Sequence, residues 1–213
     1  KCVFATDQVL YLGHVLSKNG VQVDKSKISA MENYPRPHNL KTLRGFLGLC
    51  GFYRRFIRGF SEITAPMHGL LKKDVPFVWN DACENAFLKL KQAMLSAPVL
   101  KFPQLDKEFV LITDASRQAI SYILNQEDEN GMSHPVGFGG RSLRKSEKNY
   151  TVTEIELLGV LEGIKHFHTY LANKRFKVLT DHVSLTYLKS LKAATGRLAR
   201  WAMYLMAYDF EII

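Results

Sequence analysis

The sequence predicts a fold of the α+β or α/β class, in which a helical segment precedes a domain built on a mixed sheet. Between residues 24 and 96, apolar residues recur at the spacing of amphipathic helices. From residue 107 onward, short apolar strands alternate with turns and with one long helix. The 213 residues leave room for one large domain or two small ones.

Short strands open the chain. In the first sixteen residues, Val9, Tyr11 and Val15 alternate with polar or small neighbours, and the turn from Lys18 to Val21 follows. Two strands are not stable alone in water, so we expect this opening to be the end of a domain that begins upstream.

Four helices are expected between residues 24 and 96. The first is short and stops before Pro35, because each proline biases its predecessor away from helix. The second has Asn39 as its N-cap and ends near Gly59. Two more are expected over residues 64–72 and 80–96. The apolar stripe of the second helix consists of Leu43, Phe46, Leu47, Cys50, Tyr53 and Ile57.

This second helix is both basic and rich in glycine. Its cations are Lys41, Arg44, Arg54, Arg55 and Arg58, and its glycines are Gly45, Gly48 and Gly51. A glycine weakens a helix by up to ~1 kcal/mol relative to alanine. Its presence therefore indicates close approach of a partner to the backbone, either a packed helix or a nucleic acid.

The second half predicts an antiparallel meander over residues 109–113, 119–125 and 133–138. A long amphipathic helix is expected over residues 153–171, followed by a strand over 176–180. The remaining expected elements are helices over residues 184–189 and 197–206 and a last strand over 208–213.

Carboxylates follow the two clearest strands. Asp114 ends one strand and Asp181 ends the other, so adjacent pairing would place both at one edge of the sheet. The long helix starts with Glu154 and Glu156, and spacing does not choose between them. Converging carboxylates repel one another unless cations are present, and hard oxygen ligands favour Mg²⁺ or Mn²⁺.

Other roles are open for each of these residues. Asp114 and Asp181 could be turn formers, and Thr153 with Glu156 fits a capping box. His182 is a candidate substrate contact, although an ordinary turn histidine is an equal alternative.

Composition narrows the function classes. The net charge is +9, and residues 1–105 hold 15 Lys and Arg against 7 Asp and Glu, which favours a polyanionic partner such as nucleic acid. No apolar window of membrane-spanning length and no signal peptide is found, so we expect an intracellular protein with no membrane partner. Cys2, Cys50 and Cys83 match neither a disulfide framework nor a zinc site.

Several ordered motifs carry a resemblance to a known family. They are Tyr11-Leu12-Gly13-His14, Leu43-Arg44-Gly45-Phe46-Leu47-Gly48-Leu49, Tyr53-Arg54-Arg55-Phe56-Ile57, Pro98-Val99-Leu100, Thr113-Asp114-Ala115-Ser116, Glu156-Leu157-Leu158, Thr180-Asp181-His182 and Arg200-Trp201. With these motifs, essentially the whole chain resembles the reverse transcriptase and RNase H region of the Pol polyprotein of gypsy-class LTR retrotransposons.

The resemblance implies a division of the chain and a role for each motif. Residues 1–23 would end the polymerase palm, 24–105 would form the thumb and connector, and 106–213 an incomplete RNase H-like domain. Asp114, Glu156 and Asp181 would be catalytic metal ligands, and the Glu-Leu-Leu string selects Glu156 over Glu154. The residues implied in nucleic-acid binding are the primer-grip-like Tyr11, Leu12, Gly13 and His14, the thumb residues Lys41, Arg44, Gly48, Arg54 and Arg55, and His182.

The implied function is hydrolysis of the RNA strand of an RNA/DNA hybrid, with two Mg²⁺ or Mn²⁺ ions and a primer–template duplex as a further partner. The rest of the Pol polyprotein would also be a partner, in cytoplasmic virus-like particles. The polymerase motif Tyr-x-Asp-Asp is absent from the sequence, so we expect no polymerisation by this chain alone. A fourth acidic ligand and the last helix are expected beyond Ile213, so weak or absent nuclease activity of the isolated chain is expected as well. A catalytically inactive or domesticated relic is one alternative, and another nuclease or an integrase of the same fold is a second.

Two stretches depart from the family pattern. Ser121-Tyr122 stands where the family often has Gly-Ala, and Gly137-Phe138-Gly139-Gly140 is also variant. We expect altered packing in this part of the sheet.

Overall fold

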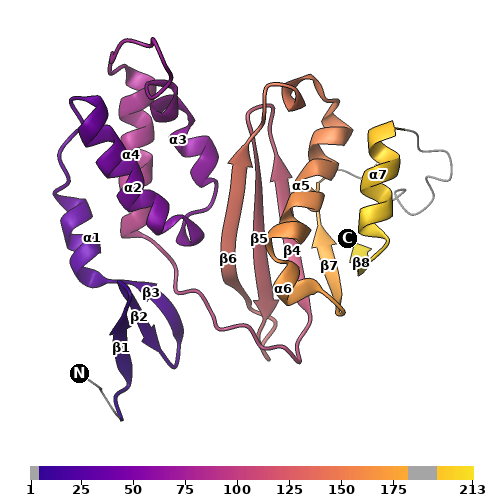
Figure 1. Cartoon of the computed structure of the whole chain (residues 1–213). Helices are drawn as coiled ribbons and strands as arrows, with labels where there is room; N and C mark the ends of the chain where they lie inside the picture. The colour runs from indigo at the N-terminus through magenta and orange to yellow at the C-terminus, as the bar shows by residue number, and fades with distance from the viewer. Residues whose placement is uncertain (1–4, 182–195) are drawn as a thin grey trace. The chain divides into compact units, whose positions relative to one another are not determined.

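The computed structural model describes residues 5–181 and 196–213, and the chain forms two compact units, Lys1–Phe102 and Pro103–Ile213 (Figure 1). The first unit is a small sheet followed by helices, and the second is a mixed sheet with helices. Among the described residues, no helix has both the length and the apolar character needed to cross a membrane.

The first unit begins with an antiparallel meander, in which β2 lies between β1 and β3. Its strands are β1 (Gln8–Tyr11), β2 (His14–Ser17) and β3 (Gly20–Val23). Val21 and Leu100 exchange backbone hydrogen bonds of 2.8 and 2.9 Å, so the connector at the end of the unit is fixed to β3.

Helices form the rest of the first unit. They are α1 (Lys25–Glu32), α2 (Leu40–Phe52), the 3₁₀ turn η1 (Arg54–Phe56), α3 (Phe60–Gly69) and α4 (Asp81–Leu95). The predicted N-cap of α2 is confirmed, because the Asn39 side chain accepts a hydrogen bond from the Thr42 N–H. The predicted apolar stripe is buried.

Two helix boundaries in this unit were predicted wrongly. The prediction carried α2 to Gly59, but it ends at Phe52 and the chain continues as η1. Gly59 has φ +66° and is instead the N-cap of α3, which starts at Phe60, four residues before the predicted start at Thr64. The apolar spacing continues through Ile57, so it does not reveal the change from α-helix to the tighter turn.

The second unit holds a five-stranded sheet in the order β6-β5-β4-β7-β8. Its strands are β4 (Phe109–Ala115), β5 (Ala119–Glu127), β6 (Ser133–Ser142), β7 (Arg175–Leu179) and β8 (Asp209–Ile212). The predicted meander of β4, β5 and β6 is confirmed, and β7 pairs parallel to both β4 and β8.

Helix α5 (Val152–His166) packs on β4 and β5. The predicted helix of residues 153–171 is interrupted at Phe167, where α5 ends and the short α6 (His168–Leu171) starts. The 3₁₀ turn η2 (Glu147–Asn149) precedes α5, and α7 (Gly196–Leu205) precedes β8. The helix expected over residues 184–189 lies outside the described residues.

The variant stretches of the meander fit one another. Tyr122 on β5 stands opposite Gly139 on β6. A Cβ atom on Gly139 would lie 2.2 Å from the Tyr122 ring, so the missing side chain leaves the space that the ring fills. His166 and Phe167 contact the same ring, with centroid distances of 5.2 and 5.9 Å.

Candidate functional site

Two carboxylates lie at one edge of the sheet. In the parallel pair of β4 and β7, Ile112 stands opposite Leu179. Asp114 and Asp181 each follow two residues later along the chain, and both are exposed. Their predicted placement at the same edge is therefore supported by the register.

Glu156 belongs to the same group of charges. It lies on α5 and is 7% exposed, and its buried Oε2 atom has no hydrogen-bond partner within residues 5–181 and 196–213. Burial, and then the charges of Asp181 and Asp114, raise the pKa of the Glu156 carboxyl from 4.5 to about 7. Glu156 is thus close enough to both aspartates for their charges to act on it.

The other acid in this part of α5 has a different environment. Glu154 Oε2 accepts hydrogen bonds from the Thr151 N–H at 2.9 Å and the Thr151 hydroxyl at 3.1 Å. Glu154 Oε1 accepts one from Arg197 Nη1 at 2.9 Å. The Thr151 hydrogen bond has the largest effect in lowering the pKa of Glu154, and the Arg197 charge adds to it. Glu154 therefore has its partners within the fold, whereas Oε2 of Glu156 has no hydrogen-bond partner among the residues that the structure describes.

This arrangement corrects the predicted capping box. The box consists of Thr151 and Glu154, and not of Thr153 and Glu156. Both pairs have the same spacing, but α5 starts at Val152, which makes Thr151 the N-cap. The capping role is thereby removed from Glu156.

The donors suit a divalent cation. A buried carboxylate oxygen without a partner is costly, and a hard cation beside Glu156, Asp114 and Asp181 would offset that cost. In the part of the chain that the structure describes, no three His, Cys, Asp or Glu side chains form a group that could already hold a metal ion. The acids interact electrostatically without forming a closed coordination shell.

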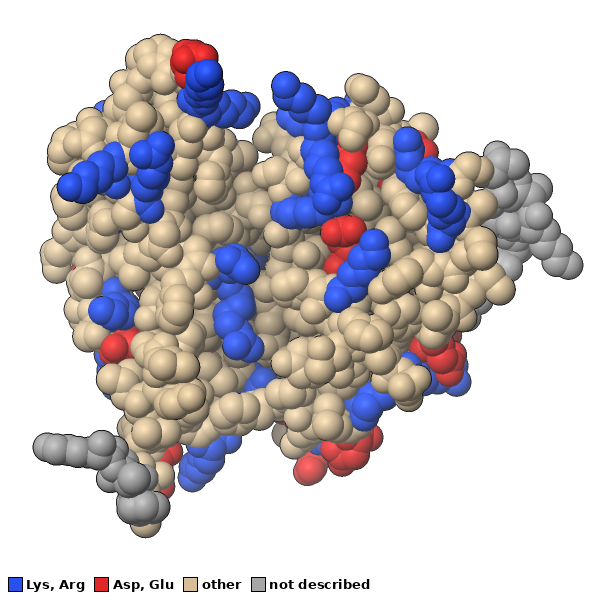
Figure 2. All heavy atoms as spheres, viewed as in Figure 1, with Lys and Arg blue, Asp and Glu red and all other residues tan. Residues whose placement is uncertain are grey.

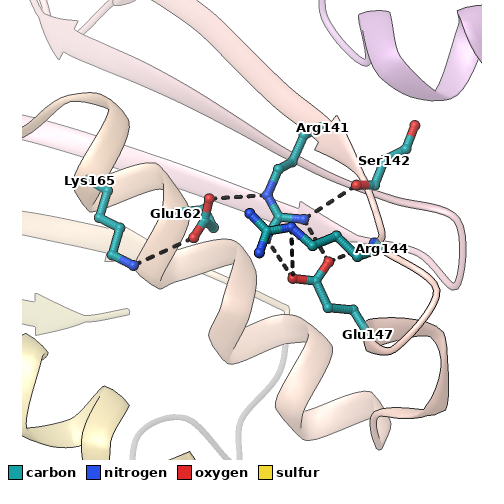
Figure 3. A network of polar contacts seen from close by, with 6 residues as sticks. All are labelled: Arg141, Ser142, Arg144, Glu147, Glu162 and Lys165. Carbon is teal, nitrogen blue, oxygen red and sulfur yellow. Dashed lines mark hydrogen bonds and ion pairs between the residues drawn. The ribbon is translucent and has the colours of Figure 1, made fainter.

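A network of ion pairs, centred on the buried Glu147, holds the loop before α5 against that helix (Figure 3). Arg141 on β6 binds both oxygens of Glu147, at 2.6 and 3.0 Å, and donates from Nε to Glu162 on α5 at 3.1 Å. Glu147 is 5% exposed and also accepts the Arg144 N–H. Arg141 thus joins the loop before α5 to the middle of that helix. Sequence reasoning missed this network, and no local pattern identifies partners that come from three separate elements.

The predicted nucleic-acid contacts of α2 and η1 are exposed. Lys41, Arg44 and Gly48 share one face of α2 at spacings of three and four residues, while Arg54 and Arg55 lie on η1. A Cβ atom on Gly48 would meet no atom within 4 Å, so packing inside the chain does not require glycine there. On the face drawn in Figure 2, Lys and Arg side chains are spread over the first unit with few acidic side chains among them.

The turn between β1 and β2 is apolar and exposed. Tyr11 is 60% and Leu12 72% exposed, and both Leu12 and Gly13 have positive φ, at +47° and +77°. The Tyr53 hydroxyl donates a hydrogen bond of 2.8 Å to the Gly13 carbonyl. The His14 ring packs against Phe52, Tyr53 and Phe56 and so anchors the turn to these aromatic residues. His182 lies outside the described residues.

Residues 79–178 match the family model described as the RNase H-like domain found in reverse transcriptase. This part of the chain thus resembles an RNase H-like domain. Over 212 residues it is 39% identical to the retrovirus-related Pol polyprotein from transposon 412 of Drosophila melanogaster, covering 100% of the chain and 17% of the relative. It is 35% identical to the transposon Tf2-3 polyprotein of Schizosaccharomyces pombe, of which it covers 16%. The chain thus spans about a sixth of these relatives.

Solved structures show the same fold. The foamy viral protease-reverse transcriptase in complex with RNA/DNA hybrid matches with a TM-score of 0.77 at 20% identity, over 97% of this chain and 29% of that one. A form of that protein in complex with double-stranded DNA matches with a TM-score of 0.78, also at 20% identity, over 97% of this chain and 38% of that one. The chain therefore shares the fold of these structures, including the RNase H-like mixed sheet with flanking helices.

Proposed function

We propose that this chain is the thumb and RNase H region of a reverse transcriptase from a gypsy-class LTR retrotransposon, and that it hydrolyses the RNA strand of RNA/DNA hybrids. The observation that carries the proposal is the buried, unpartnered Oε2 of Glu156 near the charges of Asp114 and Asp181. Similarity along the whole chain to Pol polyproteins of transposons supports it.

Asp114, Glu156 and Asp181 would hold the divalent cations, Mg²⁺ or Mn²⁺, with two ions expected. Bound there, the ions would supply Lewis acidity to the attacking water and to the leaving oxygen of the phosphodiester. The carboxylates orient that chemistry from two strand ends and one helix, all in the second unit. Because the pKa of Glu156 is raised to about 7, cation binding near neutral pH would release a proton from this residue.

The first unit would grip the duplex without reading its sequence. Lys41, Arg44, Arg54 and Arg55 would neutralise phosphates, and Gly48 would let a strand approach the α2 backbone. Tyr11, Leu12 and Gly13 would contact the primer strand, and His14 would fix the shape of their turn. A predicted contact of His182 with substrate completes this set. The resemblance adds the rest of the Pol polyprotein as a partner and cytoplasmic virus-like particles as the location.

The deciding experiment measures cleavage of a labelled RNA/DNA hybrid with Mg²⁺ by the wild-type chain, extended past Ile213 to include the expected fourth acid and last helix, and by its Asp114→Asn variant. We expect the substitution to lower the cleavage rate at least 100-fold, because it removes a charge from the cation site. Asp209→Asn on β8 is the matched control, since Asp209 is exposed and outside the acid group. Salt-sensitive hybrid binding without cleavage would favour the inactive relic. Cleavage of double-stranded DNA instead of the hybrid would favour another nuclease of this fold.

Substitution of Gly48 separates stability from binding. Gly48→Ala should stabilise the first unit by about 0.5 to 1 kcal/mol, because the site is helical and open. The same variant should weaken duplex binding several-fold, since the added methyl group stands on the face of Lys41 and Arg44. Thermal melting and fluorescence anisotropy measure the two effects. Gly69→Ala is the matched control and should leave binding unchanged. Gly69 is also helical, in α3, and a Cβ atom there would likewise meet no atom within 4 Å. Equal binding by both variants would remove Gly48 from the interface.

A further inference from the structure

The Glu156 carboxylate, near the start of α5, lies in an unfavourable buried position that other contacts must maintain. Glu156 is a buried carboxylate whose Oε2 has no hydrogen-bond partner among the described residues, which is costly for a charged group. Opening of the first turn of α5 would let Glu156 turn into water and relieve that cost. The cap from Thr151 opposes this opening, but a single N-cap contributes only about 1 kcal/mol.

Arg197 supplies a second restraint from a distant part of the chain. It lies at the start of α7 and forms an ion pair of 2.9 Å with Glu154, the residue that closes the capping box. Its guanidinium stacks over the Tyr150 ring at 3.7 Å from the centroid and lies 6.0 Å from the Trp201 centroid. Tyr150 and Trp201 also contact each other, at a centroid distance of 5.9 Å. Arg197 is thus held by an acid on one side and by aromatic rings on others.

We propose that Arg197 is a positioning residue for Glu156: by fixing Glu154 and the first turn of α5, it keeps Glu156 directed at the cation site. This inference rests on the proposed function. Glu154 and Glu156 are two residues apart, so they point to different sides of the helix. Holding Glu154 on the side of α7 therefore holds Glu156 on the other side, and it also keeps the Glu154 carboxylate from competing for the cation.

Loss of this restraint should loosen the start of α5 without unfolding the domain. The Arg141 network remains in place and fixes both the preceding loop and the middle of α5 through Glu147 and Glu162 (Figure 3). The expected consequence is a weaker cation site on an intact fold. Partners that orient metal ligands typically change metal affinity 10- to 100-fold when removed, roughly the range expected for Arg197.

The test is Mn²⁺ affinity of the chain, measured by electron paramagnetic resonance of the free ion, which needs no substrate. Arg197→Ala should raise the dissociation constant about tenfold. Arg197→Lys keeps a cation beside Glu154 and should hold the constant within about threefold of wild type. Arg175→Ala is the matched control, because Arg175 pairs with Glu211 on the exposed side of the sheet, and it should change nothing. Should Arg197→Ala fail to fold, Arg197→Met replaces it, since methionine retains stem packing on Tyr150 without the charge.

A double-variant comparison separates positioning from general stability. In a Glu156→Gln background, Arg197→Ala should weaken Mn²⁺ binding no further, because the group it positions is gone. Equal losses in both backgrounds would overturn the inference, as would wild-type affinity in Arg197→Ala while the wild-type chain cleaves hybrid. Failure of the wild-type chain both to bind Mn²⁺ and to cleave hybrid would overturn the proposed function, and the inference with it.

Discussion

Replacing Glu156 with glutamine is expected to stabilise the cation-free RNase H-like domain by about 2 to 3 kcal/mol at pH 8 while abolishing hybrid cleavage. Burial and the charges of Asp181 and Asp114 raise the pKa of Glu156 to about 7 from 4.5. The folded state therefore keeps a proton that the unfolded chain releases above about pH 4.5. Stability consequently falls as pH rises from 4.5 to about 7, and it stays low above that range. Glutamine cannot ionise, so the variant escapes this loss.

Thermal denaturation at pH 5 and pH 8, without divalent cations, measures the effect. At pH 5 the folded wild-type protein is largely protonated at Glu156, so the variant should differ little from it. Glu129→Gln in the exposed turn between β5 and β6 controls for removal of a surface charge. Adding Mg²⁺ should stabilise the wild-type protein and leave Glu156→Gln almost unaffected. A variant no more stable than wild type at pH 8 would show that the Glu156 charge is compensated within the fold.

Features that depend on near neighbours in sequence were predicted well. Asn39 caps α2, as its position before an apolar stripe indicates. The meander of β4, β5 and β6 followed from alternating strands with short turns. In each case the deciding groups lie within a few residues of one another.

Features that depend on distant contacts were predicted less well. The end of α2 at Phe52 is reinforced by Tyr53, whose hydroxyl binds the Gly13 carbonyl 40 residues away. The start of α5 had two equivalent Thr-x-x-Glu patterns, and spacing alone could not choose between them. The ion pair of Glu154 with Arg197 spans 43 residues and follows from no local pattern.

The three acids Asp114, Glu156 and Asp181 were predicted from different signals in the sequence. Matching strand ends predicted that Asp114 and Asp181 share an edge, and the register of β4 with β7 supports this. The choice of Glu156 over Glu154 rested on the resemblance. The structure adds the physical reason, because Glu154 is bound by Thr151 and Arg197 while Glu156 has an unpartnered oxygen.

Gly139→Ala is expected to destabilise the domain by about 2 to 3 kcal/mol, because its Cβ atom would lie 2.2 Å from the Tyr122 ring. The ring cannot easily retreat, since His166 and Phe167 pack against it and Gly163 lies close beneath its Cβ. Gly137→Ala on the same strand is the matched control. Its Cβ atom would meet Phe167 at 3.5 Å, an ordinary contact, so the cost should be small. Denaturant titration of both variants measures the difference.

The same substitution in a Tyr122→Ala background tests whether the glycine and the tyrosine are adapted to each other. Tyr122→Ala alone should cost about 3 kcal/mol through the cavity it leaves. In the double variant, Gly139→Ala should cost at least 1 kcal/mol less than it does in wild type, since the clash is gone. Strict additivity would contradict the pairing. Because Tyr122 stands opposite Thr113, the residue before Asp114, displacement of the ring in Gly139→Ala should also lower hybrid cleavage. The fit between Gly139 and Tyr122 would then support cleavage by holding the β4 residues next to Asp114 in place.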